Sequence, residues 1–255
     1  NPDLKWETTG MLNVGVDFGF FDGRLSGSIE YYNKVTKDLI WDYPVSSYSQ
    51  PFGWISANVG QITNNGVEFS LTATPVQTKD FTWSTTLNLS HNKNIVDKLS
   101  NETYKTSLFT QGDPMVAGVS ANGWTQRIME GEPLGTFYTY EWAGVDSEGV
   151  SVYYTRDENG NRDGKTTRDP DLKDRTITGC AQPKVNLGWS NNFNYKNWSA
   201  SAFFTGVFGH DVYNGLRAHY TAPDFFAGGK NVLKEFITDR SAKDTGSNIP
   251  SDRFI

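Results

Sequence analysis

The fold is decided by the stretch Met11-Leu12-Asn13-Val14-Gly15-Val16-Asp17-Phe18-Gly19-Phe20, in which apolar residues alternate with small or polar ones. Alternation with a period of two places successive side chains on opposite faces of a β-strand. An Asp22-Gly23 step follows, which is a strong signal for a two-residue hairpin turn. The chain then alternates again from Leu25 to Tyr32, so the sequence predicts two long antiparallel strands joined by a tight turn.

Two further pairs of strands have the same form, with short breaks at Pro75 to Asp80 and at Lys196-Asn197. Long connections are expected between the hairpins, from Val35 to Asn65 and from His91 to Lys184. Short turns at one end and long loops at the other are typical of an outer-membrane barrel, with the short turns in the periplasm. The alternating runs of these two hairpins are residues 67–74, 81–90, 185–195 and 198–208.

A soluble β-sandwich also alternates, because one face of each sheet is wet, so alternation alone leaves both architectures open. Strand length favours the barrel, because the runs extend for about 10 residues, enough to cross a bilayer, whereas soluble strands average about 5 or 6. Large aromatic residues near the strand ends suit an interfacial girdle, although a sandwich would place them in its core. They are Phe20, Phe21, Tyr31, Tyr32, Phe81, Trp83, Tyr195, Trp198 and Phe208.

Composition excludes some classes of protein. The 255 residues carry a net charge of −6 without a basic stripe, which argues against a nucleic-acid binder. Mean hydropathy is −0.54, which leaves a membrane barrel open, because its lipid-facing and lumen-facing residues alternate. The first seven residues lack the basic start and apolar core of a signal peptide, and Ser251 to Ile255 ends where a strand is expected to begin. We therefore expect an internal piece of a longer protein.

The topology of the middle of the chain follows from parity. If the turn at Pro75 to Asp80 is periplasmic, the strand ending near Ser90 finishes outside, and the strand beginning near Val185 starts outside. Any segment between them must cross the membrane an even number of times. The runs 135–142 and 150–155 are one candidate for such a crossing hairpin. Because both are short and are interrupted by Gly144 and Gly149, we expect them instead to pair as a hairpin within a large extracellular loop region, residues 91–184.

Several phrases of the sequence resemble, in order and from end to end, the late barrel strands of SusC/RagA-type TonB-dependent transporters. The resemblance implies an all-β, antiparallel transmembrane β-barrel segment, residues 1–255, that is part of a 22-stranded barrel in the cell outer membrane. It also implies an N-terminal plug and closing strands outside this chain, contact with TonB through that absent region, a SusD-like surface lipoprotein as lid, and oligosaccharide or peptide cargo. The phrases are Asn1-Pro2-Asp3-Leu4-Lys5-Trp6-Glu7, Tyr31-Tyr32-Asn33-Lys34, Thr36-Lys37-Asp38-Leu39-Ile40, Asn58-Val59-Gly60, Asn65-Gly66-Val67-Glu68, Pro133-Leu134-Gly135-Thr136-Phe137-Tyr138, Asp174-Arg175-Thr176, Gln182-Pro183-Lys184 and Ser251-Asp252-Arg253-Phe254-Ile255.

Aromatic residues in the expected outer loops are the candidates for contact with a ligand or a partner. An aromatic face with a polar tip suits a sugar or a protein lid, and the alternative is that these rings pack the loops together. The candidates are Trp41, Tyr43, Tyr48, Phe52, Trp54, Trp124, Tyr138, Tyr140 and Trp142.

One acidic loop has the spacing of a calcium site. Asp157, Asn159, Asn161 and Asp163 place oxygen ligands at alternate positions, which suits Ca²⁺. Arg162 stands where a Gly is expected, so a solvated, turn-rich loop is the other interpretation. No other cofactor is indicated.

No catalytic group stands out. The three histidines lack metal-ligand spacing, and the sequence has no nucleophile motif and no phosphate-binding glycine loop, so we do not expect an enzyme. A nutrient importer segment is the preferred function. A secreted, soluble glycan-binding β-sandwich is the main alternative, and a glycoside hydrolase domain is a weaker one.

Overall fold

The computed structural model divides the chain into two compact units, which are described separately. The first comprises residues 1–107, 129–133 and 182–210, and the second comprises residues 108–128, 134–181 and 211–255. The structure describes residues 2–46, 48, 52–106, 108–111, 124–221, 229, 231–239, 244 and 249–255.

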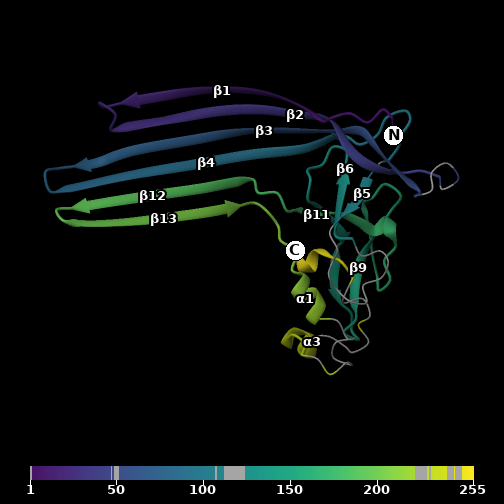
Figure 1. Cartoon of the computed structure of the whole chain (residues 1–255). Coiled ribbons are helices and arrows are strands. Elements are labelled where there is room, and N and C mark those ends of the chain that lie inside the picture. Colours follow the sequence, from purple (N-terminus) through teal and green to yellow (C-terminus); the bar gives the residue numbers. More distant parts are fainter. Residues whose placement is uncertain are drawn as a thin grey trace. The chain divides into compact units, whose positions relative to one another are not determined.

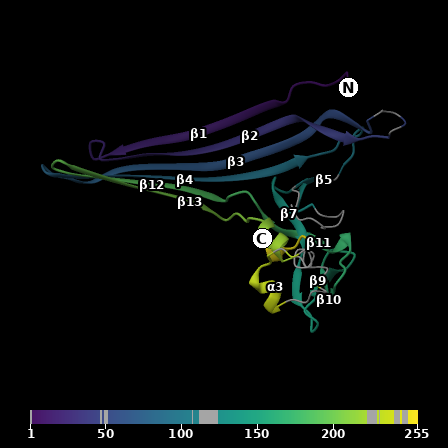
Figure 2. The same cartoon turned by 60° about the horizontal axis from the view of Figure 1, so that its bottom comes forward.

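The first unit is built on a six-stranded antiparallel sheet with the order β1-β2-β3-β4-β12-β13. The strands run side by side in both cartoon views (Figures 1 and 2). They are β1 (Thr8–Phe20), β2 (Leu25–Pro44), β3 (Trp54–Gln77), β4 (Phe81–Lys98), β12 (Val185–Tyr195) and β13 (Trp198–Phe208).

The three short turns of this sheet lie at the same end, at the left of Figure 1. They connect β1 to β2, β3 to β4, and β12 to β13. Strand β4 pairs directly with β12, and none of the described residues between them adds a strand to this sheet. Among the described residues, β12 thus follows β4 directly in this sheet, and the even number of crossings between them stays a prediction.

The predicted connection from Val35 to Asn65 is wrong, because β2 continues to Pro44 and β3 begins at Trp54. The alternation is lost there because a bulge interrupts the pairing of β2 with β3, and Asp38 takes a positive φ of 58° within it. Strand β4 likewise continues past His91 to Lys98. At 24 residues β3 is about twice the length that crosses a bilayer, so its far part extends beyond the membrane.

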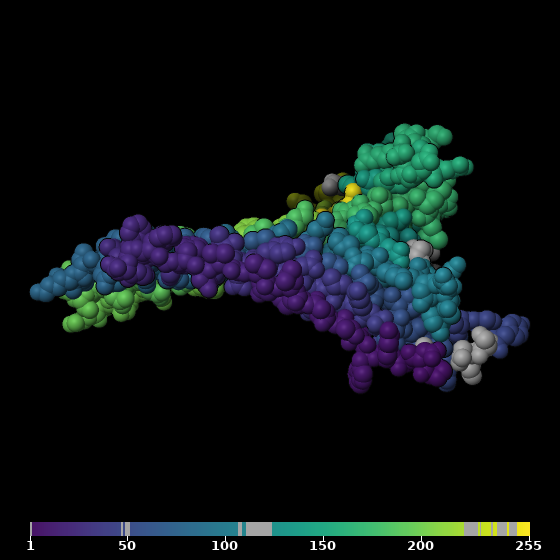
Figure 3. Space-filling model, turned by 90° about the horizontal axis from the view of Figure 1, so that it is seen from above, coloured from purple at the N-terminus to yellow at the C-terminus, as the bar shows by residue number. Residues whose placement is uncertain are grey.

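One face of the sheet is apolar. Val16 lies opposite Ile29, and Ile29 opposite Phe69, and the row continues across β4 and β12 through Leu89 and Leu187. Val16 is 65% exposed and Ile29 is 50% exposed. In the space-filling view the N-terminal part of the sheet, in purple, lies at the surface (Figure 3). A sandwich would bury this row against a second sheet, so the β-sandwich interpretation is wrong for this face.

Exposed aromatic residues gather where the short turns lie. Phe20 ends the first strand and Phe21 begins the turn that follows it, and Tyr195 and Trp198 flank the last turn. Trp198 is 78% exposed and Phe21 is 75% exposed. Aromatic rings at this level are typical of the girdle that a membrane barrel places at the bilayer interface.

The second unit contains two small sheets. One has the order β11-β7-β6-β5 and the other the order β10-β9-β8. No helix in the described part of the chain has the length and apolar character needed to cross a membrane. The elements are β5 (Leu108–Gln111), β6 (Gln126–Met129, whose last residue belongs to the first unit), β7 (Thr136–Tyr140), β8 (Trp142–Val145), β9 (Ser151–Arg156), β10 (Arg162–Thr167), η1 (Leu172–Asp174), β11 (Arg175–Cys180), α1 (Gly215–Tyr220), α3 (Lys234–Asp239) and η2 (Asp252–Phe254).

The predicted hairpin between the runs 135–142 and 150–155 is only partly right, because Trp142 pairs with Tyr153 whereas the rest of the first run pairs elsewhere. Residues 136–140 form β7, which pairs with β6 and β11, whereas β9 pairs with the short strand β8. The chain turns from one sheet into the other at Glu141, which lies between β7 and β8. Two consecutive short runs of similar composition therefore belong to two sheets, a distinction that alternation alone does not carry.

Candidate functional site

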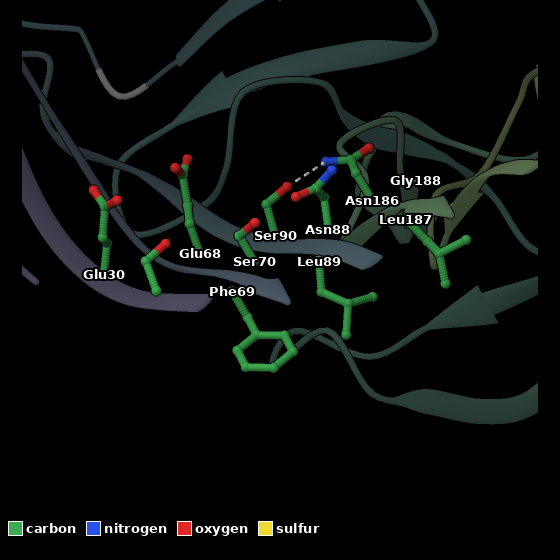
Figure 4. Close-up of a pocket in the computed structure, with 11 residues that line it drawn as sticks. Glu30, Glu68, Phe69, Ser70, Asn88, Leu89, Ser90, Asn186, Leu187 and Gly188 are labelled. Atoms are coloured by element: carbon green, nitrogen blue, oxygen red, sulfur yellow. Dashed lines mark hydrogen bonds between the residues drawn. The ribbon is translucent and has the colours of Figure 1, made fainter. Parts of the chain in front are cut away.

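The face opposite the apolar one is polar. Ser28, Ser70 and Asn88 are successive cross-strand partners, and the next row contains Glu30 and Glu68. In Figure 4 the side chains of both glutamates and of the neighbouring serine and asparagine residues point to one side of the sheet, whereas Phe69, Leu89 and Leu187 point to the other. The polar side chains line an open hollow of about 460 Å³. Such a face suits the lumen of a transport barrel.

Glu30 and Glu68 lie directly opposite each other on β2 and β3. Like charges in this position are destabilising in an isolated sheet, so the pair adds negative charge at a cost in stability. Asn13 donates to Glu30 Oε2 at 3.4 Å, and Gly15 opposite Glu30 leaves room for its side chain, because a Cβ there would lie 2.9 Å from Glu30 Cγ. Sequence reasoning did not single out this pair, because the two residues meet only through the strand register.

Three of the phrases that carried the family resemblance meet at one end of the sheet. The side chain of Asn58 accepts from Lys5 N at 2.8 Å and donates to Lys5 O at 2.8 Å and to Asp38 O at 2.7 Å. Lys5 Nζ also pairs with Asp38 at 2.9 Å. Glu7 Oε1 accepts from Ile40 N at 3.0 Å, beside the bulge. The side chains of Asn58 and Glu7 thus form hydrogen bonds with Asp38 O and Ile40 N, backbone groups that the bulge removes from the strand ladder.

The candidate aromatics of the β2–β3 region divide by exposure. Tyr48 is fully exposed, Phe52 is 77% exposed and Trp54 is 51% exposed, and the Phe52 and Trp54 rings lie 6.2 Å apart. Trp41 is half-buried. Tyr43 is 1% exposed, and its hydroxyl donates to Leu99 O at 2.7 Å while its ring packs on Tyr104. Tyr43 therefore has the environment of a packing residue, and the three exposed rings remain available for contact.

The candidate aromatics of the second unit divide in the same way. Trp124 is 45% exposed, whereas Tyr140 is 2% exposed and packs edge-on against Tyr153. Tyr138 is half-buried beneath the guanidinium of Arg127. Trp142 is also half-buried, and its Nε1 donates to Ser151 Oγ at 3.3 Å. Trp124 is thus the most accessible of these four rings.

The acidic loop forms the turn between β9 and β10. Asp157 Oδ1 accepts from the backbone N–H groups of Asn159 and Asn161, both at 2.9 Å. Asp163 Oδ1 accepts from Thr155 Oγ1 at 2.5 Å and from Lys165 N at 3.0 Å, and the Thr155 bond lowers the pKa of the Asp163 carboxyl. Among the described residues no group of three or more acidic, histidine or cysteine side chains is arranged to hold a metal ion.

The turn between β8 and β9 has the same hydrogen bonds without the calcium spacing. Asp146 Oδ1 accepts from Glu148 N at 2.9 Å and Val150 N at 3.1 Å, and Gly149 takes a positive φ of 76°. Gly160 takes a φ of 81° at the equivalent place in the Asp157 turn. Carboxylates that accept local backbone N–H groups and a left-handed glycine are ordinary devices of three-residue hairpin turns. The geometry of Asp157 is therefore explained by the hairpin, and calcium binding stays a prediction.

The glutamate between the two sheets joins the hairpin to the rest of the unit. The Glu141 carboxylate accepts hydrogen bonds from Arg162 Nε at 3.0 Å and Nη2 at 2.9 Å. It also forms an ion pair with Arg156. The hydrogen bond from Arg162 is the main cause that lowers the pKa of the Glu141 carboxyl, and Arg156 lowers it further. Arg162 also lies over the Tyr154 ring. This network fixes the β9–β10 hairpin on the second unit.

An open antiparallel sheet with one apolar and one polar face, an aromatic girdle and strands longer than a bilayer defines a segment of an outer-membrane β-barrel. Residues 1–205 match the family described as "TonB dependent receptor-like, beta-barrel". The chain belongs to this family of TonB-dependent receptors, which is one of transporters rather than enzymes.

Individual relatives support this family assignment. The chain is 34% identical to TonB-dependent receptor P3 of Formosa agariphila, over 98% of the chain and 25% of that protein. It is 30% identical to TonB-dependent receptor SusC of Bacteroides thetaiotaomicron, over 84% of the chain and 20% of that protein. A solved structure of the RagAB peptide transporter matches 98% of the chain and 26% of its own chain, with a TM-score of 0.77 and 26% identity. The chain thus spans about a quarter of the length of these proteins.

Proposed function

We propose that this chain is part of an importer that takes up glycans or peptides across the outer membrane, with energy delivered through TonB. The single observation that carries the proposal is the two-faced sheet, whose polar rows around Glu30 and Glu68 alternate with lipid-suited rows around Val16 and Ile29. A polar wall suits the passage of hydrophilic cargo, and an apolar wall suits contact with lipid.

The relatives and the loops together support this choice of cargo class. The solved relative is named a peptide transporter, and the SusC relative belongs to the same receptor family. Exposed rings at Tyr48, Phe52 and Trp54 supply flat apolar surfaces that suit either a sugar ring or a peptide side chain. We assign these rings, with Trp124, to the recognition of cargo or of a SusD-like lipoprotein lid.

An uptake assay tests the proposal on the full-length protein in its own cell. Labelled oligosaccharide and peptide pools are offered to wild-type cells, to cells lacking this receptor and to cells lacking TonB. We expect at least one pool to enter wild-type cells and to be excluded from both deletion strains. Uptake that survives loss of TonB contradicts TonB-dependent import, and uptake of every pool without the receptor contradicts a transport role.

A charge-neutral variant tests whether the polar face contacts cargo. Replacing both Glu30 and Glu68 with Gln keeps the side-chain shapes and removes two charges from the same wall. We expect altered uptake of charged cargo, whereas the matched variant Glu158→Gln, in the exposed β9–β10 turn, leaves uptake unchanged. Equal uptake by all three proteins for charged and neutral cargo contradicts contact between this pair and the cargo.

A further inference from the structure

Two arginines of the second unit share one face of a sheet with two tyrosines. Arg127 on β6 lies opposite Thr136 on β7, and Arg175 on β11 lies opposite Tyr140, four residues further along β7. Because side chains two and four positions apart share a face of a strand, both arginines project to the side of Tyr138 and Tyr140. Arg127 lies over the Tyr138 ring at 4.1 Å and Arg175 over the Tyr140 ring at 4.9 Å.

Within the described part of the chain, the hydrogen-bonding groups of these two guanidiniums are only partly satisfied. Arg175 is 4% exposed, and its Nη1 donates to Trp124 O at 3.0 Å. Its Nε and Nη2 atoms are buried and have no hydrogen-bond partner among the described residues, and the same is true of Arg127 Nε. Among the residues that the structure describes, no carboxylate forms an ion pair with either arginine. A buried guanidinium N–H without a partner is unfavourable, because it has lost its water and gained nothing in return.

The two donors of Arg175 without a described partner are Nε and Nη2. Other arginines of this chain use the same two atoms to bind carboxylates. Arg162 uses Nε and Nη2 to hold the two oxygens of Glu141, at 3.0 and 2.9 Å. Arg217 uses the same two atoms to hold Glu235, at 3.0 and 2.8 Å. The fork geometry of guanidinium matches a planar carboxylate at this edge. On Arg175 the same pair of donors is unoccupied.

The neighbouring charge strengthens the case for an anion. Burial lowers the pKa of Arg127; Tyr138 opposes this, and the positive charge of Arg175 lowers the pKa further. Two like charges in a poorly solvated place repel each other, and an anion bound by Arg175 would offset this repulsion and satisfy its missing hydrogen bonds. The tyrosine rings beneath the guanidiniums supply only part of this compensation.

We infer that Arg175 Nε and Nη2, with Arg127 Nε, form a carboxylate-binding site. The carboxylate has two sources: a small ligand such as an acidic cargo, or an acidic side chain from the parts of the full-length protein outside this chain. Both present the same planar, bidentate group to the fork. The site does not depend on the proposed transport function, because it rests only on the second unit.

The first experiment uses acetate as the probe and the full-length protein in detergent. Its thermal unfolding is followed with sodium acetate and with acetamide, at matched ionic strength, because acetamide has the same planar shape without the charge. We expect acetate but not acetamide to raise the melting temperature. Arg175→Lys keeps the charge and loses the fork, so it is expected to weaken acetate binding on the order of tenfold or more.

Matched variants keep the test independent of folding. Arg127→Gln changes a half-buried residue and is expected to weaken acetate binding less than Arg175→Lys does. Arg168→Gln is the control, because Arg168 is already occupied by Asp146 and Glu148, and acetate binding is expected to stay unchanged. Equal responses to acetate and acetamide, or equal acetate binding by wild type and both site variants, overturn the free-ligand source.

A high-resolution map of the full-length protein in carboxylate-free buffer decides the second source. Density that connects an acidic side chain of the protein to Arg175 Nε and Nη2 supports the site and identifies its occupant as internal. Absence of such density, together with no effect of acetate on melting temperature, overturns the proposal.

Discussion

The side chain of Asn58 bonds the backbone of Lys5 as a neighbouring strand would. Its Oδ1 accepts from Lys5 N and its Nδ2 donates to Lys5 O, each at 2.8 Å. The segment before β1 is thereby fixed to β3, two strands away in the sheet order. The same Nδ2 reaches Asp38 O in the bulge of β2. One amide therefore joins three segments that are separated by up to 53 residues in sequence.

Replacing Asn58 with Ala removes these three hydrogen bonds, of which the one to Asp38 O is partly buried and the two to Lys5 are exposed. We expect a loss of about 1–3 kcal/mol in the free energy of unfolding. Asn58→Asp keeps the acceptor for Lys5 N and loses both donors, so its effect is expected to be intermediate or larger. Heat-modifiable migration of the full-length barrel on denaturing gels measures the effect, with Asn159→Ala in an exposed turn as the control. A barrel as resistant as wild type in the Asn58→Ala variant contradicts the structural role.

We expect an arginine substitution to lower the stability of the barrel by different amounts on the two faces of β1. Val16 and Asp17 are neighbours that point to opposite faces. An arginine at Val16 enters the apolar face, where a charge near the middle of the bilayer costs about 2–4 kcal/mol. An arginine at Asp17 enters the polar face and is expected to have a much smaller effect. Denaturant unfolding of the full-length protein in lipid vesicles measures both, and a larger loss at Asp17 contradicts the assignment of faces.

The alternation of apolar residues from Leu12 to Phe20 was enough to predict the strand and its hairpin partner. The same pattern failed at Asp38, because a bulge shifts the period by one residue and a run of strand then resembles a loop. Burial of Tyr43 and Tyr140 was also beyond the sequence, since each ring packs on a residue brought in by tertiary structure.

The prediction of candidate sites from the sequence was limited in the same way, because tertiary contacts decide which residues meet. The paired position of Glu30 and Glu68 depends on register, and the free edge of Arg175 depends on which carboxylates lie nearby. Neither property belongs to a single segment. The Asp157 loop shows the opposite problem, because the same residues that ligate calcium also build tight turns.

The Glu141 network makes the β9–β10 hairpin sensitive to acid. The pKa of the Glu141 carboxyl is lowered in the folded hairpin. The ionised carboxylate therefore stabilises the hairpin fully above the ordinary pKa of 4.5, and this stabilisation is lost as the pH falls through the lowered pKa. Glu141→Gln is expected to show the loosened hairpin already at neutral pH. Hydrogen exchange of residues 151–167 in the full-length protein measures it, with Glu158→Gln compared at each pH. Equal protection in both variants at neutral pH contradicts the role of Glu141.

The Asp157 turn separates its two interpretations by a pair of variants. Asp157→Ala removes the acceptor for two backbone N–H groups and is expected to increase hydrogen exchange in the turn, whereas Asp157→Asn keeps an acceptor and is expected to retain protection. Calorimetry with Ca²⁺ on the intact protein tests the metal prediction. Heat that is lost in Asp157→Asn and Asp163→Asn supports a calcium site, and no heat in wild type removes it.

The segment between β4 and β12 is predicted to lie outside the cell. Strand β4 ends, and strand β12 begins, at the end of the sheet opposite the short turns. The two strands pair with each other directly. We therefore expect a membrane-impermeant maleimide to label Asn161→Cys on whole cells, in a background in which the single native Cys180 is replaced by Ser. Lys79→Cys, in the short turn between β3 and β4, is the matched control and is expected to react only after the outer membrane is permeabilised.

The same labelled position tests the lid. A SusD-like lipoprotein that covers this segment slows the reaction of Asn161→Cys, so deletion of the lipoprotein is expected to accelerate it. The accessible ring of Trp124 and the exposed hairpin turns give the segment groups that suit burial against a protein partner. An unchanged rate removes the partner from this segment and leaves its position outside intact. Labelling of Asn161→Cys only after permeabilisation instead places the segment in the periplasm, which reverses the orientation of the whole sheet.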